Sequence, residues 1–207
     1  MDYLEGLNPQ QRAAVETIDG PVMIVAGAGS GKTRVITYRV AHLIQKGVDA
    51  FNILVLTFTN KAAKDMRERI TKVVGPEAKN LWMGTFHSVF AKILRVEADK
   101  IGYPSNFTIY DTDDSKSLVR SILREMQLDD KLYNANFVFN RISSAKNNLI
   151  SWGEYMNNAE IQAEDIATNR PLLGVIYETY TKRCFKAGAM DFDDLLFKTN
   201  VLLKDHP

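Results

Sequence analysis

Two short apolar runs in the first third of the chain are each followed by a segment with helical periodicity. Residues 22–25 and 53–56 are continuous apolar runs, which is typical of strands buried on both faces of a parallel sheet. Apolar residues then recur at helical spacing through residues 32–45 and again through residues 62–73. The pattern therefore predicts two consecutive strand-then-helix units.

Further elements extend this alternation. Asn8 followed by Pro9 indicates the start of a helix that ends near Gly20. Residues 81–83 and 107–110 are expected strands, with a helix over residues 88–100 between them. Together these elements predict an α/β fold in which helices cover both faces of a parallel sheet.

The pattern changes after Asp111. Apolar positions from there to residue 190 follow helical or irregular spacing, without a convincing strand. We therefore expect the first part of the main domain over residues 1–111 and an inserted all-helical subdomain over residues 112–190. Residues 191–207 are expected to form a helix that returns to the main domain.

Composition sets few limits on the partners. The 207 residues include 26 Lys and Arg against 25 Asp and Glu, a formal net charge of +1, so a nucleic-acid surface must be a local patch. The single cysteine, Cys184, excludes an internal disulfide and favours a reducing compartment. No apolar run approaches the ~20 residues that span a bilayer, and the first residues lack a signal-peptide pattern. The sequence thus predicts a cytoplasmic protein with no membrane partner.

A glycine-rich loop separates the first predicted strand from its helix. It consists of Ala26, Gly27, Ala28, Gly29, Ser30, Gly31, Lys32 and Thr33, and it matches the Walker A pattern except for alanine at the first position. Such a loop turns backbone N–H groups towards phosphate oxygens, and the following helix presents its positive end to the same anion. Lys32 is the candidate cation for the outer phosphates, and the Thr33 hydroxyl is the candidate ligand for Mg²⁺. A chance lysine in a glycine-rich turn is the alternative, but the coincidence of strand, loop and helix favours a nucleoside triphosphate site.

Short motifs on both sides of this loop follow one another in a specific order. They are residues 7–11 (Leu-Asn-Pro-Gln-Gln), 31–34 (Gly-Lys-Thr-Arg), 57–63 (Thr-Phe-Thr-Asn-Lys-Ala-Ala), 84–88 (Gly-Thr-Phe-His-Ser), 144–147 (Ser-Ala-Lys-Asn) and 191–195 (Asp-Phe-Asp-Asp-Leu). This series resembles the UvrD/PcrA/Rep group of superfamily 1 DNA helicases along nearly the whole chain. The resemblance implies a P-loop NTPase (RecA-like) fold that uses ATP and moves 3′ to 5′ on DNA. It also implies that Gln11 reads the adenine edge and that Arg34 packs on the base.

The same resemblance implies a track for single-stranded DNA. Its candidate residues are Phe58, Thr59, Asn60, Lys61, Thr85, Phe86 and His87, together with Lys146 in the helical insertion. Residues 57–60 follow a predicted buried strand, where open α/β sheets place ligand sites, and Phe58 can offer a ring to a base. An ordinary core phenylalanine beside a helix cap fits the same spacing, and His87 could contact phosphate or cap its helix. Most cations of residues 61–72 fit a solvated helix face.

An acid that would hold Mg²⁺ and activate water is not evident, because no apolar run ends in Asp-Glu. Asp111, after the strand predicted over residues 107–110, is a rival candidate. Asp191, Asp193 and Asp194 could bind a metal, although acids at a helix start usually cap it. The resemblance implies that the missing acid motif and a second motor domain would follow residue 207. We therefore expect this chain to bind ATP without turnover.

The sequence thus favours the N-terminal ATP-binding part of an ATP-dependent DNA helicase in repair or replication. Its expected partners are single-stranded DNA, single/double-strand junctions and the C-terminal motor domain of the same protein. A helicase-like subunit of a helicase-nuclease and a stand-alone P-loop phosphotransferase are the alternatives. The phosphotransferase would need its own acid and substrate pocket within this chain.

Overall fold

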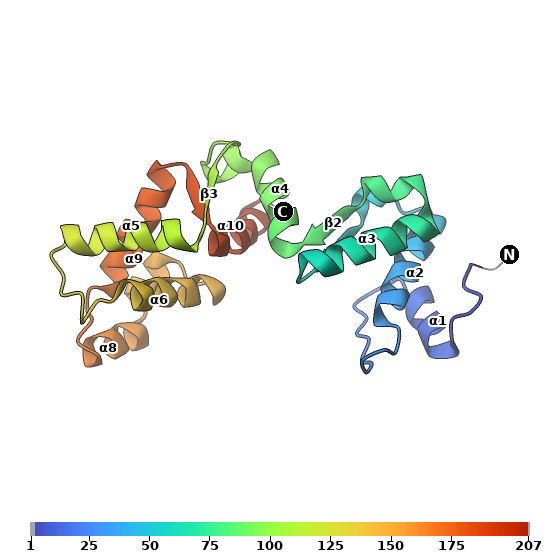
Figure 1. The fold of residues 1–207 in the computed structure, drawn as a ribbon, viewed down its shortest axis with the longest axis horizontal. Coiled ribbons are helices and arrows are strands. Elements are labelled where there is room, and N and C mark those ends of the chain that lie inside the picture. The colour runs from blue at the N-terminus through green and yellow to red at the C-terminus, as the bar shows by residue number, and fades with distance from the viewer. Residues whose placement is uncertain (1–2, 207) are drawn as a thin grey trace. The chain divides into compact units, whose positions relative to one another are not determined.

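The computed structural model describes residues 3–206, which fall into two compact units (Figure 1). The first unit ends at Val89 and the second begins at Phe90, so the division lies within helix α4 (Phe86–Val96). The fold of each unit is considered by itself below.

Helices cover a parallel strand pair in the first unit. The helices are α1 (Pro9–Glu16), α2 (Lys32–Gln45) and α3 (Asn60–Val74), the strands are β1 (Leu54–Thr57) and β2 (Trp82–Thr85), and 3-10 turns lie at η1 (Ala50–Asn52) and η2 (Pro76–Asn80). In the parallel register Thr57 lies opposite Thr85, so the carboxyl ends of both strands meet. These strands confirm the predictions over residues 53–56 and 81–83 to within two residues.

The core of this unit lies between α2, α3 and the strand pair. Val40, Val55, Met66, Ile70 and Met83 are buried together there. Met66 and Ile70 are four residues apart, so they lie on one face of α3 and turn it towards the strands. The apolar periodicity of the sequence therefore sets which face of α3 is buried.

The strand predicted over residues 22–25 is wrong. These residues have no regular secondary structure, and the side chains of Met23 and Val25 are 87% and 85% exposed. A strand needs a neighbour for its N–H and C=O groups, and the only strand pair within residues 3–89 joins β1 to β2. The apolar run therefore has no ladder to complete in the described part of the chain.

The second unit is mainly helical. It contains η3 (Ala98–Ile101), β3 (Thr108–Tyr110), α5 (Thr112–Glu125), α6 (Ala135–Asn147), α7 (Trp152–Asn157), α8 (Ala159–Ala167), α9 (Leu173–Lys186), β4 (Ala189–Asp191) and α10 (Phe192–Asp205). The large apolar cluster joins α5, α6 and α9 through residues such as Ile122, Ile142 and Tyr180. The strand predicted over residues 107–110 is confirmed as β3.

Strand β3 pairs in parallel with β4, a strand that the sequence pattern did not reveal. Parallel pairing is therefore confirmed, but the two pairs form separate two-stranded sheets within residues 3–206. Helix α10 packs against α6 and η3. No helix of the described chain combines the length and apolar character needed to cross a membrane.

Candidate nucleotide and nucleic-acid site

The phosphate-loop candidate adopts a conformation that depends on glycine. Gly29 and Gly31 have φ angles of 77° and 90°, in the left-handed region that side chains disfavour. Helix α2 begins directly afterwards at Lys32, and no side chain caps its N-terminus. The backbone N–H groups of its first turn are thus left for another acceptor, as at an anion-binding helix end.

The loop satisfies its own polar side chains in this state. Lys32 Nζ donates to the carbonyl oxygens of Ala26 and Gly27 at 2.6 and 2.8 Å, and Ser30 Oγ donates to the same Gly27 oxygen at 2.6 Å. Both contacts use carbonyls rather than carboxylates, so the ammonium keeps its charge uncompensated. A phosphate oxygen is therefore a stronger partner for Lys32 than its present acceptors.

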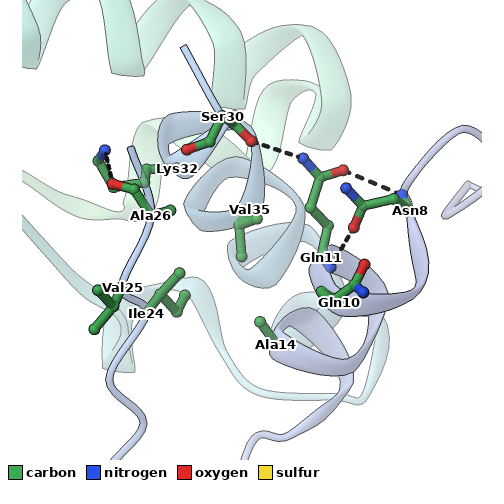
Figure 2. A pocket seen from close by; sticks show the side chains of 10 residues that line it. All are labelled: Asn8, Gln10, Gln11, Ala14, Ile24, Val25, Ala26, Ser30, Lys32 and Val35. Atoms are coloured by element: carbon green, nitrogen blue, oxygen red, sulfur yellow. Dashed lines mark hydrogen bonds between the residues drawn. The ribbon is translucent and has the colours of Figure 1, made fainter. Parts of the chain in front are cut away.

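Gln11 connects helix α1 to this loop (Figure 2). Its Nε2 donates to Ser30 O at 3.0 Å, while its Oε1 accepts from the backbone N of Asn8 at 3.2 Å. Asn8 completes the capping box by accepting from Gln11 N at 2.8 Å. A Cβ at Gly31 would lie only 2.8 Å from Gln11 Nε2, so glycine is needed there for this approach as well as for the turn.

A cavity of about 290 Å³ opens between these groups. Figure 2 shows its lining: Asn8, Gln10, Gln11, Ala14, Ile24, Val25, Ala26, Ser30, Lys32 and Val35. The lining has an apolar side, amide groups from α1 and one cation, and it contains no acid. Such a surface suits an anion that carries a flat ring.

The two remaining nucleotide candidates lie in the first turn of α2. The guanidinium of Arg34 lies 5.6 Å from the centre of the Tyr38 ring, one helical turn further along. The Thr33 carbonyl accepts from Thr37 Oγ1 at 2.9 Å. The sequence analysis did not identify Tyr38, although an arginine and an aromatic residue four positions apart share a helix face.

Aromatic rings gather at the carboxyl ends of β1 and β2. The side chain of Phe58 is 90% exposed, and its ring centre lies 5.5 Å from that of Phe86. Since Thr57 and Thr85 are opposite one another in the parallel register, the motifs that follow them are neighbours. An exposed ring in this position is not a core phenylalanine, and its face is available to a base.

Threonines begin both helices at this edge. Thr59 Oγ1 accepts from Ala62 N at 3.1 Å at the start of α3, and Thr85 Oγ1 accepts from Ser88 N at 3.2 Å at the start of α4. The candidates Asn60, Lys61 and His87 lie in the first turns of these helices. Helix starts place N–H groups and positive dipole ends at this edge, which favours phosphate.

Two residues that support this edge, Gly84 and Arg67, were not among the site residues predicted from the sequence. A Cβ at Gly84 would lie 2.5 Å from Ser88 Oγ, so the glycine permits the close start of α4. Arg67 Nη2 donates to Met83 O at 2.6 Å and ties α3 to β2, although the sequence pattern assigned it to a solvated face. Gly84 could have been found, because a glycine inside a strand is a recognisable signal. Arg67 had no such signal in the sequence.

Lys146, a candidate for contact with DNA, lies in the second unit with only 2% of its surface exposed. Its Nζ contacts Asp191 Oδ2 at 2.7 Å and Asp194 Oδ1 at 2.9 Å. The hydroxyl of Tyr180 donates to the same Asp191 oxygen at 2.7 Å. In this arrangement Lys146 joins α6 to the start of α10, and contact with DNA would require it to leave two carboxylates.

Burial and charge pairing act in opposite directions within this cluster. Burial alone would lower the pKa of Lys146, but Asp194 and Asp191 outweigh it and the pKa is raised. Burial alone would raise the pKa of Asp191, but the ammonium and the Tyr180 hydroxyl lower it below its usual value. For Asp194 burial dominates, and its pKa is raised. The cluster therefore favours the charged form of Lys146 and the ionised form of Asp191, whereas burial makes ionisation of Asp194 less favourable.

Three of the acids considered as metal ligands, Asp111, Asp191 and Asp194, belong to helix caps, and Asp193 accepts from Asn147 Nδ2 at 3.0 Å. Asp111 Oδ1 accepts from the backbone N of Asp113 and of Asp114, both at 2.8 Å, at the start of α5. Asp191 caps α10 in the same way by accepting from Asp194 N at 2.8 Å. No group of three or more His, Cys, Asp or Glu within residues 3–206 converges as a metal site.

The UvrD/REP helicase N-terminal domain family matches residues 7–207. The chain belongs to this family. The match includes the loop with Lys32, the Gln11 motif and both strand-end motifs.

Similar helicases are much longer than this chain. The ATP-dependent DNA helicase PcrA of Bacillus subtilis strain 168 is 44% identical over 205 residues, which are 99% of this chain and 27% of that protein. PcrA of Staphylococcus aureus strain Mu50 is 41% identical over the same shares of both chains. The ATP-dependent DNA helicase UvrD1 of Mycobacterium bovis is 45% identical over 206 residues, 99% of this chain and 26% of that protein. The chain thus spans about a quarter of the length of these relatives.

Proposed function

We propose that this chain is the ATP-binding part of an ATP-dependent DNA helicase that moves 3′ to 5′ on single-stranded DNA. The observation that carries the proposal is the uncapped start of α2 behind a glycine loop, with Lys32 and the Gln11 amide beside one cavity. Relatives at 41–45% identity are named ATP-dependent DNA helicases, which supports it. In this proposal residues 1–111 begin a P-loop (RecA-like) motor domain, residues 112–190 are its helical insertion and residues 191–207 return to it.

The nucleotide would replace internal contacts of the loop. The Lys32 ammonium would exchange the carbonyls of Ala26 and Gly27 for phosphate oxygens, and the free N–H groups of α2 would bind the same phosphates. The Gln11 amide would turn from Ser30 and Asn8 towards the adenine edge. Arg34 would pack on the base.

The residues of this site can hold Mg²⁺ only together with a bound nucleotide. The Thr33 hydroxyl follows Lys32 in the first turn of α2, whereas no acid lines the cavity. Thr33 would therefore hold the ion together with phosphate oxygens, which are the hard ligands that Mg²⁺ prefers. When bound, the ion would neutralise charge on the outer phosphates.

Single-stranded DNA would follow the edge at which β1 and β2 end. Phe58 would stack on a base beside Phe86, and the starts of α3 and α4 would hold the backbone through Thr59, Asn60 and Thr85. Few cations take part, so the affinity should depend only weakly on salt. We further propose a cytoplasmic location, since the one cysteine of the sequence is a buried free thiol.

Base recognition can be tested by thermal melting with Mg-ATP and with Mg-GTP. We expect a larger shift in melting temperature with ATP, because the Gln11 amide can pair with the donor and acceptor of the adenine edge. Gln11→Ala should shrink the difference between the two nucleotides. Equal shifts with ATP and GTP in the unchanged chain would contradict the adenine assignment.

The DNA track can be tested by fluorescence anisotropy with a labelled oligothymidine. Phe58→Ala should weaken binding by about 1–3 kcal/mol if a base stacks on the ring. Phe51→Ala is the matched control, because Phe51 is also exposed and also packs against one aromatic neighbour, Trp82. Equal losses in both variants would show that the strand-end edge has no special role.

A further inference from the structure

A groove on the first unit lies between α2 and α3 and shares no lining residue with the cavity beside Lys32. It encloses about 250 Å³. Arg34, Thr37 and Tyr38 line it from α2, and Arg69, Lys72 and Val73 line it from α3. Both helices are packed firmly in the core of the unit, so the groove is part of a fixed scaffold.

The floor of the groove is apolar. The Tyr38 ring is half-buried, and Val73 leaves 38% of its surface exposed. The Thr37 hydroxyl is buried and already donates to Thr33 O, so it offers little to a ligand. An apolar side chain can therefore rest on this floor without losing hydrogen bonds.

The rim of the groove is cationic. Arg34, Arg69 and Lys72 are exposed, and none of them forms an ion pair within residues 3–206. The acids Asp65 and Glu68 stand four residues before Arg69 and Lys72 on α3, but neither forms an ion pair within residues 3–206. No carboxylate lines the groove, so three cations and no acid surround its apolar floor.

We propose that this groove docks an acidic segment of a partner protein. Carboxylates on the segment would pair with Arg34, Arg69 and Lys72, and one apolar side chain between them would rest on Tyr38 and Val73. Arginine favours this chemistry, because a guanidinium binds a carboxylate through two parallel hydrogen bonds. Charge complementarity thus fixes the sign of the partner, and the apolar floor fixes its anchor.

The groove is less suited to a nucleic-acid strand. Sequence-tolerant binding of a strand requires aromatic faces on which bases stack. Tyr38 is the one aromatic ring in the groove, and the Arg34 guanidinium already lies over it at 5.6 Å. A protein segment needs no free ring face.

Occupation of the groove should also oppose nucleotide binding. Arg34 lies two residues after Lys32, and under the proposed function it packs on the adenine. One guanidinium cannot serve both the base and a carboxylate of the segment. This coupling rests on the proposed function, whereas docking itself does not.

Anisotropy of a fluorescein-labelled peptide, Glu-Glu-Asp-Phe-Glu-Glu, tests the docking. The double variant Arg69→Glu with Lys72→Glu should weaken binding at least about tenfold, because both charge pairs become repulsive. Lys64→Glu with Lys79→Glu changes the net charge equally outside the groove and should leave binding within about twofold. Replacing the peptide's phenylalanine by serine should also weaken binding.

Several results would overturn the proposal. They are absence of peptide binding, equal losses in the two double variants, or indifference to the phenylalanine. Oligothymidine binding is also measured in both double variants. If only Arg69→Glu with Lys72→Glu loses it, the groove binds nucleic acid and the proposal is overturned.

The coupling is tested by adding Mg-ATP to the peptide titration. Mg-ATP should weaken peptide binding, and unchanged binding despite a nucleotide-induced rise in melting temperature would overturn the shared use of Arg34. Failure of the proposed function is distinguishable, because Mg-ATP would then leave the melting temperature unchanged while the peptide still binds.

Discussion

Removal of the buried ammonium by Lys146→Met should destabilise the second unit severely. The substitution keeps an unbranched side chain of similar length, but it removes the cation that contacts both Asp191 and Asp194. Both carboxylates are almost fully buried. They cannot be rehydrated without opening the contact between α6 and α10.

The expected loss is about 3–5 kcal/mol of unfolding free energy, the usual consequence of removing one partner of a buried ion pair. With a urea slope of about 2 kcal/mol per molar, this corresponds to a midpoint that is lower by roughly 2 M. The loss should be full near pH 7. Because the pKa of Lys146 is raised in the folded chain, its contribution to stability is lost only when the pH rises through that folded value. Because the pKa of Asp191 is lowered, its contribution is fully present above the usual Asp range.

The variant should recover part of its stability as the pH falls towards 5. The pKa of Asp194 is already raised by burial, and without the ammonium this carboxyl takes up a proton more readily. Protonation removes the buried charge and supplies a donor to Asp191. The difference in unfolding free energy between the two chains should therefore be smaller at pH 5 than at pH 7.

Tryptophan fluorescence provides a specific assay. The chain has two tryptophans, Trp82 in the first unit and Trp152 in the second, so a Trp82→Phe background makes the emission report the second unit alone. Lys100→Met is the control, since this lysine forms a surface pair with Glu97 in the second unit and its removal should leave the unfolding free energy nearly unchanged.

Two outcomes would refute this reasoning about the buried cluster. The first is a loss for Lys146→Met no larger than that for Lys100→Met. The second concerns the triple variant Lys146→Met, Asp191→Asn, Asp194→Asn, which should recover most of the stability because it removes all three charges of this cluster and asparagine can still cap α10. A triple variant as unstable as the single one would show that packing, and not charge, carries the effect.

Three further predictions concern single side chains. Lys32→Ala should abolish the rise in melting temperature that Mg-ATP causes. The melting temperature of the free chain should stay unchanged, because Lys32 contacts only carbonyls of its own loop. An undiminished rise contradicts the assignment of Lys32 to phosphate binding. Hydrogen bonds from Arg183 and Ser121 lower the pKa of Glu125 to about 2, so any stabilisation by this pair is present above pH 4.5 and is lost as the pH falls towards 2. An NMR titration should show that Arg183→Gln returns this pKa towards 4.5, and an unshifted value in the variant excludes the pairing in solution. Burial raises the pKa of the Cys184 thiol to about 12. A thiol reagent at pH 8 should therefore label Cys184 slowly in the native chain and faster in Lys146→Met. Fast labelling of the native chain contradicts the burial of this thiol.

Local signals in the sequence were sufficient for the starts of α1 and α2 and for strands β1, β2 and β3. The Asn8–Pro9 pair marks the N-cap of α1, and the acids around Asp111 and Asp191 proved to be caps. These signals act within about one helical turn, so they need no knowledge of the rest of the fold. The positions of β1, β2 and β3 followed from their apolar runs for the same reason.

The failures concern partners that are distant in sequence. The apolar run over residues 22–25 has the composition of a strand, but composition does not reveal whether a neighbouring strand is at hand. Lys146 belongs to a polar motif in the sequence, and its carboxylate partners lie 45 and more residues further along the chain. In the sequence Arg67 cannot be distinguished from the other cations of α3, and only the folded structure shows that it donates to Met83 O. Burial of a charge depends on the assembled fold and has no local signature.

Helix capping also separates the proposed triphosphate site from the proposed DNA edge. Helices α3 and α4 begin with threonines whose hydroxyls already accept a backbone N–H, so one donor of each first turn is taken. Helix α2 begins after Gly31, which has no side chain to accept any, and Lys32 stands at its first position. A multiply charged phosphate gains most where the donors are free and a cation is adjacent, and a nucleic-acid strand is held more weakly where one donor of each helix start is already taken. The choice of glycine at one helix start and threonine at the other two therefore suits tight nucleotide binding and loose DNA binding within one unit.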